Sequence, residues 1–163
     1  MDTKITAKNL KIAKETTEEL LKLLNIEAGV KAESLESSIS IDISGEDLGL
    51  LIGHQGDNLE ALQLVLGLIV NNKKNGPADW TPVSVDVGGW REEKSQALKS
   101  MIENIAAEIE KEGGERALPP MPASQRRMAH LILADFPGLI SESDGEEPNR
   151  RVIIKKGSKE NGG

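Results

Sequence analysis

The chain has 163 residues, a length that allows one ordinary domain or two small ones. Its 27 Asp and Glu outnumber its 20 Lys and Arg, for a net charge of −7, and with two Trp, one Phe and no Tyr its core must be almost wholly aliphatic. The absence of Cys excludes disulfides, thiolate metal sites and a Cys nucleophile. No apolar run approaches the roughly 18 residues of a membrane helix, and residues 1–10 lack the apolar stretch of a signal peptide. We therefore expect a soluble, cytoplasmic protein without membrane insertion.

Hydrophobic spacing in the first part of the chain predicts alternating helices and strands. Isoleucines alternate with polar residues over 39–43, and valines do so over 83–87, which is the period of a strand buried on one face. The predicted elements, in chain order, are a helix over 5–25, strands over 28–33 and 39–43, a helix over 46–52, a glycine-rich break over 53–56, a helix over 57–72, a loop over 73–82 and a strand over 83–87.

A long amphipathic helix over 90–112 opens the second part of the chain and is ended by Gly113 and Gly114. The elements that follow are a short strand over 115–118, a helix over 123–136 and strands over 139–143 and 150–156. The sequence thus predicts an α/β (α+β) fold in two small domains. Their bounds are residues 1–89 and 115–156, with a connecting helix in 90–114 and a disordered tail over 157–163.

The first candidate site is the glycine-rich break Gly53-His54-Gln55-Gly56. A Gly-x-x-Gly tetrapeptide alone carries little information in a chain with 16 glycines, and it could simply join two helices. Its context is more informative, because two helices flank it, two strands precede it and a third follows. This is the element order of a type II KH domain, whose GXXG loop clamps a nucleic-acid backbone. Glycine permits close approach to phosphate, and the helix beginning at Asp57 and Asn58 would point its positive end at the loop.

The second candidate site lies in the last part of the chain, where residues 119–163 carry 7 Lys and Arg against 6 Asp and Glu. Arg126 and His130 are four residues apart, so they share one helix face beside an apolar stripe. The pair could contact nucleic acid. Alternatively, Arg126 could brace the fold by pairing with Glu142 or Asp144, and His130 could have a structural role. The basic residues that accompany the pair are Arg127, Arg150 and Arg151.

Together these motifs resemble the Jag family of bacterial RNA-binding proteins, also called KhpB or SpoIIIJ-associated proteins. The family joins a type II KH domain to an R-3-H domain, which is named for its Arg-xxx-His helix. The matching stretches follow the family's order and are residues 51–56, 57–63, 85–91, 121–130 and 142–153. The resemblance implies a KH domain with a three-stranded sheet and helices on one face, followed by a small α/β R-3-H domain.

The resemblance also implies a function: binding of single-stranded RNA by a post-transcriptional regulator linked to cell division or envelope synthesis. The implied protein partner is a KhpA-like KH protein, or a second copy of the chain in a homodimer. Two departures are visible. The family loop usually carries basic residues where this chain has His54 and Gln55. Members often begin with a further small domain, whereas Met1 lies close to the first predicted helix, so we carry over no function of that domain.

Other interpretations of the sequence remain open. The chain could be a protein-interaction adaptor or dimerisation module with weak or vestigial RNA binding, which the net charge of −7 and the neutral loop favour. Trp90 could stack on a base or anchor a core. No catalytic residue, metal site or cofactor is predicted. Glu146 and Glu147 lie in a turn between Gly and Pro, and two His without a carboxylate cluster do not make a metal site.

Overall fold

The computed structural model describes residues 5–74 and 80–157. The chain divides into two compact units, residues 1–91 and 92–163. The predicted loop over 73–82 lies partly outside the described residues, and the predicted tail over 157–163 lies outside them except for Gly157. No helix in the described part of the chain combines the length and the apolar character that crossing a membrane requires.

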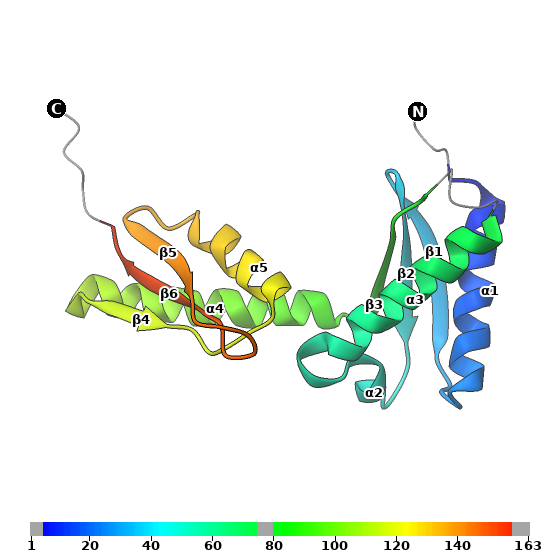
Figure 1. The fold of residues 1–163 in the computed structure, drawn as a ribbon, viewed down its shortest axis with the longest axis horizontal. Coiled ribbons are helices and arrows are strands. Elements are labelled where there is room, and N and C mark those ends of the chain that lie inside the picture. The colour runs from blue at the N-terminus through cyan, green and yellow to red at the C-terminus, as the bar shows by residue number, and fades with distance from the viewer. Residues whose placement is uncertain (1–4, 75–79, 158–163) are drawn as a thin grey trace. The chain divides into compact units, whose positions relative to one another are not determined.

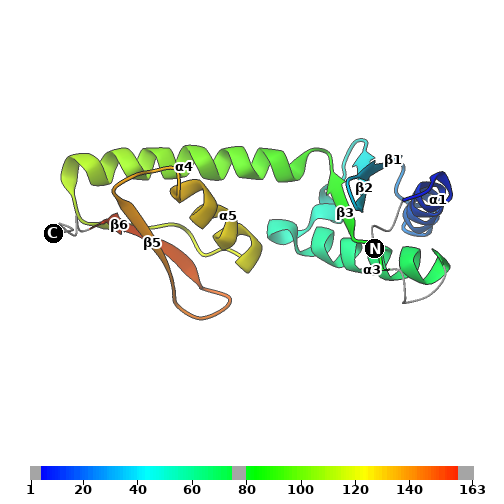
Figure 2. The same cartoon turned by 90° about the horizontal axis from the view of Figure 1, so that it is seen from above.

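The first unit is a three-stranded sheet with two long helices side by side on one face (Figures 1 and 2). Its strands lie in the order β1-β2-β3; β1 pairs antiparallel with β2, and β2 pairs parallel with β3. The elements are α1 (Ala7–Leu23), β1 (Gly29–Leu35), β2 (Ser38–Ser44), α2 (Gly49–Ile52), a 3₁₀ turn (His54–Gly56), α3 (Asp57–Lys74) and β3 (Val83–Val87).

The aliphatic core of this unit follows from the alternation in its strands. Ile41 and its register partner Val85 are both buried, with Ile39 and Ile43 on the same face of β2. The helix α3 places Leu66 into this core. The helix α1 is capped by Thr6, whose side chain accepts from the Asn9 backbone N–H, while the Asn9 side chain accepts from the Thr6 backbone N–H at 2.8 Å. This reciprocal cap satisfies two of the N–H groups that a helix start leaves unpaired.

Two predicted boundaries in the first unit are wrong. The helix predicted over 46–52 is only the four-residue α2. Asp47 has a φ of 53°, and a residue with left-handed φ cannot be part of a right-handed helix, so the helix cannot extend back to residue 46. The first strand does not run over 28–33; it begins at Gly29 and continues to Leu35, which pairs with Ser38. The hairpin therefore closes with two residues rather than with the five, 34–38, that separate the predicted strands.

The second unit packs a three-stranded antiparallel sheet, in the order β4-β6-β5, against helices. The elements are α4 (Trp90–Glu112), whose residues from Glu92 onward belong to this unit, β4 (Glu115–Ala117), α5 (Ala123–Leu133), β5 (Leu139–Asp144) and β6 (Arg151–Lys156). Ile102 and Ile109 of α4 are buried in one cluster with Val152 and Ile154 of β6. The division into residues 1–89, 90–114 and 115–156 stays a prediction. These contacts show in addition that α4 shares a hydrophobic core with the second unit.

The helix predicted over 123–136 ends earlier, at Leu133. Its last turn tightens, since the N–H of Phe136 donates to the carbonyl of Leu133, three residues back, at 3.0 Å. Pro137 follows and has no N–H with which to continue the helix. The predicted α/β class, with a three-stranded sheet and helices on one face in the first unit, is confirmed.

Candidate nucleic-acid interface

The glycine-rich break forms a sharp turn between α2 and α3. Gly53 has φ 72° and ψ −169°, Gln55 has φ 52°, and Gly56 has φ 90°. Positive φ at three of four positions reverses the chain within a few residues, and such values cost little only at glycine. His54 is exposed at the tip of this turn. The predicted loop is therefore an open turn at the start of an 18-residue helix.

Two side chains hold this turn from inside the first unit. The amide Nδ2 of Asn58 donates to the carbonyl of Leu50 at 2.8 Å, so α3 is tied to the last turn of α2. A Cβ on Gly53 would collide with Asn58, and a Cβ on Gly56 would collide with the ring of Trp90. Trp90 is half-buried and packs against the core of the unit, which supports the core role weighed for it above.

The turn is exposed at His54 and carries no Lys or Arg of its own. No Lys or Arg occurs in residues 32–72, and Glu46, Asp47 and Asp57 are exposed close to the turn along the chain. The lysines that end α3 are engaged elsewhere: Lys73 lies 3.4 Å from Glu19, and Lys74 is buried and donates to Thr81. Within residues 32–72, attraction for an anion therefore comes from backbone N–H groups and the α3 dipole.

In the second unit, Arg126 is a buried brace. Its side chain is only 9% exposed; Nη1 donates to the carbonyl of Met121 at 2.8 Å, and Nη2 lies 2.7 Å from Oε1 of Glu147. The brace weighed in the sequence analysis therefore forms, but neither Glu142 nor Asp144 is its partner. In the β5–β6 register those two residues pair with Ile153 and Arg151, on the face of the sheet away from α5.

His130 uses both ring nitrogens within the second unit. Nδ1 lies 2.8 Å from the hydroxyl of Ser141, and Nε2 lies 3.0 Å from the hydroxyl of Ser143. Neither serine was predicted as a site residue. Their spacing in β5 was a usable signal, since alternation places Leu139, Ser141 and Ser143 on one face, the face toward α5.

The predicted basic residues do not form one cluster. Val152 and Ile154 of β6 are buried on the helix-covered face, so Arg151 and Lys155 lie on the opposite face of the sheet from Ser143. Lys155 is engaged with Glu142 at 2.9 Å, and the pKa of Lys155 is raised above its usual value by that hydrogen bond and the charge of Glu142. Arg150 and Arg151 are exposed.

A shallow hollow of about 360 Å³ gathers the residues that remain on the helix-covered side. Arg127 is exposed there and has no ion pair within the described ranges of the chain. Its backbone neighbour Arg126 contributes to the floor with a side chain already held by Glu147. The lining residues are Ala123, Arg126, Arg127, His130, Leu131 and Ser143. The structure thus brings Arg126, Arg127 and His130 together and leaves Arg151 on the other face.

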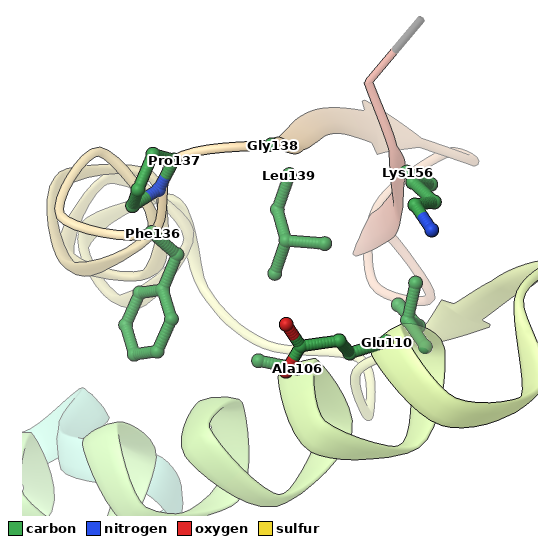
Figure 3. A pocket seen from close by; sticks show the side chains of 8 residues that line it. Ala106, Glu110, Phe136, Pro137, Gly138, Leu139 and Lys156 are labelled. Atoms are coloured by element: carbon green, nitrogen blue, oxygen red, sulfur yellow. The ribbon is translucent and has the colours of Figure 1, made fainter.

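A second hollow of about 330 Å³ lies between α4, the turn after α5 and β6 (Figure 3). Leu139 points into it, with Phe136 and Pro137 on one side and Lys156 on the other (Figure 3). No predicted site residue lines this hollow, and Glu110 brings a negative charge to it. It is therefore not part of the candidate interface.

Comparison with known proteins matches both units to domain families. The KH domain of KhpA/KhpB matches residues 11–78, and the R-3-H domain matches residues 96–156. Similar curated proteins include the RNA-binding protein KhpB of Clostridium symbiosum, 31% identical over 142 residues, which are 86% of this chain and 63% of that protein. KhpB of Streptococcus pneumoniae serotype 2 is 30% identical over 131 residues, covering 80% of this chain and 39% of the relative. KhpB of Bacillus subtilis is 28% identical over 127 residues, covering 77% and 60%.

The fold and the two matches define a protein that joins a type II KH domain to an R-3-H domain. The chain belongs to the KhpB family, also called Jag, as its motifs indicated. It spans less than two thirds of the length of these relatives, from 39% to 63%.

Proposed function

We propose that this chain binds the backbone of single-stranded RNA in the cytoplasm, through the turn at residues 53–56 and the hollow beside Arg127. The observation that carries the proposal is the turn itself: it is exposed at His54 and held in shape by Asn58 and Trp90. A turn fixed in advance loses little conformational entropy on binding. The relatives named RNA-binding protein KhpB support the same proposal.

In the first unit, Gly53 and Gly56 allow the positive φ values of the turn, and their lack of a Cβ leaves room for Asn58 and Trp90 to hold the turn in shape. His54 and Gln55 flank the RNA without adding charge. Asn58 acts from behind the turn, because its amide is already bonded to Leu50. Asp57 begins α3 as an exposed carboxylate and repels phosphate, so the first unit alone should bind RNA weakly.

In the second unit, Arg127 is the residue placed to pair with a phosphate, because it is exposed beside the hollow and unpaired among the described residues. Arg150 and Arg151 add positive charge to the neighbouring hairpin end and the outer sheet face. Arg126 and His130 shape the hollow from within. Their hydrogen-bonding groups are engaged by Met121, Glu147 and two serines.

A charge series at His54 tests the role of the turn. His54→Lys should tighten binding of a single-stranded RNA and His54→Asp should weaken it, since the position is exposed and its backbone φ is not left-handed. Fluorescence anisotropy with a labelled oligonucleotide measures both affinities. Ser37→Lys is the matched control, because it adds the same charge at the hairpin between β1 and β2, the opposite end of β2 from α2.

The expected order of affinity is His54→Lys, then the unaltered chain and Ser37→Lys together, then His54→Asp. Equal affinities for the two His54 variants would show that RNA does not approach the turn. A Ser37→Lys variant that binds as tightly as His54→Lys would show that only net charge matters.

A second proposal concerns protein partners: the outer face of α3 docks a second KH domain, from a KhpA-type protein or from another copy of this chain. Leu64, Val65 and Leu68 share this face and are 64%, 42% and 52% exposed, while the opposite face of α3 fills the core. A helix apolar on both faces indicates a second buried contact. The family match through a KH domain common to KhpA and KhpB supports this partner.

Leu68→Glu should abolish this association, since a carboxylate would be buried at the contact. Leu23→Glu is the control, because Leu23 is 75% exposed on α1. Sedimentation of each variant, alone and mixed with a KhpA protein, gives the assembly state. Association that survives Leu68→Glu would exclude the α3 face.

The post-transcriptional role in cell division or envelope synthesis is also a proposal, and it rests on family membership alone. Crosslinking in cells followed by sequencing of the bound RNA tests it. We expect transcripts of division and envelope genes to be enriched over an acidic control protein. Enrichment no greater than the control would favour the adaptor function.

A further inference from the structure

The side chain of Ser143 occupies a position that no other hydroxyl of β5 shares. Ser141 and Ser143 lie on the same strand face, and each bonds one nitrogen of the His130 ring, at 2.8 and 3.0 Å. Only Ser143 lines the hollow beside Arg127. The two serines therefore have the same partner and different exposure to a ligand in the hollow.

A hydroxyl donates one hydrogen and accepts others, so its partner decides where its hydrogen points. If Nε2 of His130 carries hydrogen, it donates to Oγ of Ser143, and the Ser143 hydrogen is released for an acceptor in the hollow. If Nδ1 carries the hydrogen instead, Ser143 must donate to Nε2 and can offer the hollow only lone pairs. A phosphate oxygen is an acceptor only, so it requires the first arrangement.

We propose that Ser143 donates a hydrogen bond to an RNA phosphate held by Arg127, and that His130 is a positioning residue that directs this donation through Nε2–H. The inference rests on the proposed function and deepens it. In the complex, Ser141 donates to Nδ1, Nε2–H donates to Ser143, and the Ser143 hydroxyl donates to phosphate. The Arg-xxx-His pair thus acts on RNA through a serine that lies thirteen positions beyond its histidine.

Replacing each serine by alanine distinguishes a direct contact with RNA from a purely structural role in holding His130. Both changes remove one hydrogen bond to His130, so Ser141→Ala is the matched control for Ser143→Ala. Ser143→Ala should weaken binding about tenfold, as for loss of a hydrogen bond to a charged group, whereas Ser141→Ala should change affinity less than about twofold. Ser143→Thr keeps the hydroxyl and should restore most of the affinity. Thermal melting of each variant confirms that binding is measured on folded protein.

The salt dependence of RNA affinity adds a second measurement, which distinguishes a neutral hydrogen-bond donor from a cation that pairs with phosphate. A neutral hydroxyl displaces no counterion, so Ser143→Ala should keep the slope of log affinity against log salt. Arg127→Ala should reduce that slope by about 0.7, the value for one phosphate of a single strand. The loss from Ser143→Ala should be equal for oligouridine and oligoadenine, because phosphate carries no sequence information.

Nitrogen-15 NMR of the His130 ring tests the arrangement on the unaltered chain, even if a variant fails to fold. We expect the Nε2–H form in the RNA complex. An Nδ1–H ring in the complex, or equal affinities for Ser143→Ala and Ser141→Ala, would overturn the role of Ser143 while leaving RNA binding intact. A chain that binds no single-stranded RNA would overturn both this inference and the proposed function.

Discussion

Arg126 and Arg127 are adjacent in the sequence and have opposite environments, because successive residues of a helix point about 100° apart. Arg126 is turned inward onto Met121 and Glu147, and Arg127 is turned outward to the hollow. The name of the R-3-H domain refers to the inward residue, Arg126. On this structure the inward arginine holds the fold, and its outward neighbour is free to meet an anion.

Arg126→Ala should therefore lower stability strongly, by about 3 kcal/mol, because it leaves the Met121 carbonyl and the Glu147 carboxylate without their donor. Glu147→Ala should cost about 1 kcal/mol, since the Glu147 side chain is 57% exposed and its loss still leaves Arg126 its bond to Met121. Chemical denaturation measures both. RNA affinity of Arg126→Ala, taken below its melting temperature, should fall much less than that of Arg127→Ala.

A stable Arg126→Ala variant with lost affinity would instead make Arg126 a direct RNA contact. The sequence could predict that Arg126 and His130 share a helix face, because that follows from a spacing of four. It could not predict Glu147 as the partner of Arg126. That pairing depends on how the hairpin between β5 and β6 folds back toward α5, which no local pattern encodes.

At the scale of elements, the turn between α2 and α3 depends on what surrounds its two glycines. Gly56 has φ 90° and lies against the ring of Trp90, which begins α4. Gly49, seven residues earlier, is helical and has open space where a Cβ would stand. The two positions therefore differ in both backbone conformation and packing.

Gly56→Ala should destabilise the first unit by at least about 2 kcal/mol, because a left-handed residue with a Cβ costs roughly 1–2 kcal/mol before Trp90 is displaced. Gly49→Ala should leave stability within about 0.5 kcal/mol of the unaltered chain. Urea denaturation followed by circular dichroism compares the two. Equal stabilities would mean that Trp90 does not support the turn in solution.

Elements with a regular hydrophobic period could be predicted from the sequence nearly to the residue, such as α4 over 90–112 and β3 over 83–87. The predicted element boundaries are wrong where a single backbone angle decides where an element begins or ends. Asp47 has an ordinary helical neighbourhood in sequence, yet its left-handed φ shortens α2 to one turn. Such angles depend on tertiary packing more than on local propensity.

For the whole molecule, electrostatics limit how RNA can be bound. The chain carries a net charge of −7, and several of its cations are held in ion pairs, such as Lys155 with Glu142, Arg126 with Glu147 and Lys73 with Glu19. The exposed arginines of the second unit are Arg127, Arg150 and Arg151. Binding should therefore involve few phosphates.

With about three phosphates contacted, the slope of log affinity against log salt should be near −2, at about 0.7 for each phosphate of a single strand. Anisotropy titrations at several salt concentrations give this slope. A slope near zero would exclude backbone recognition. A slope steeper than about −5 would require lysines outside the candidate interface to contact RNA as well.

The contact between Trp90 and Gly56 also gives the protein an optical property. The chain has two Trp and no Tyr, so all of its near-ultraviolet fluorescence comes from Trp80 and Trp90. Trp80 is 52% exposed, and Trp90 lies half-buried against the turn. Replacing Trp80 by Phe would leave a single emitter in contact with Gly56. Occupancy of the turn by RNA could then be read from the emission of this Trp80→Phe variant, without a dye on either molecule.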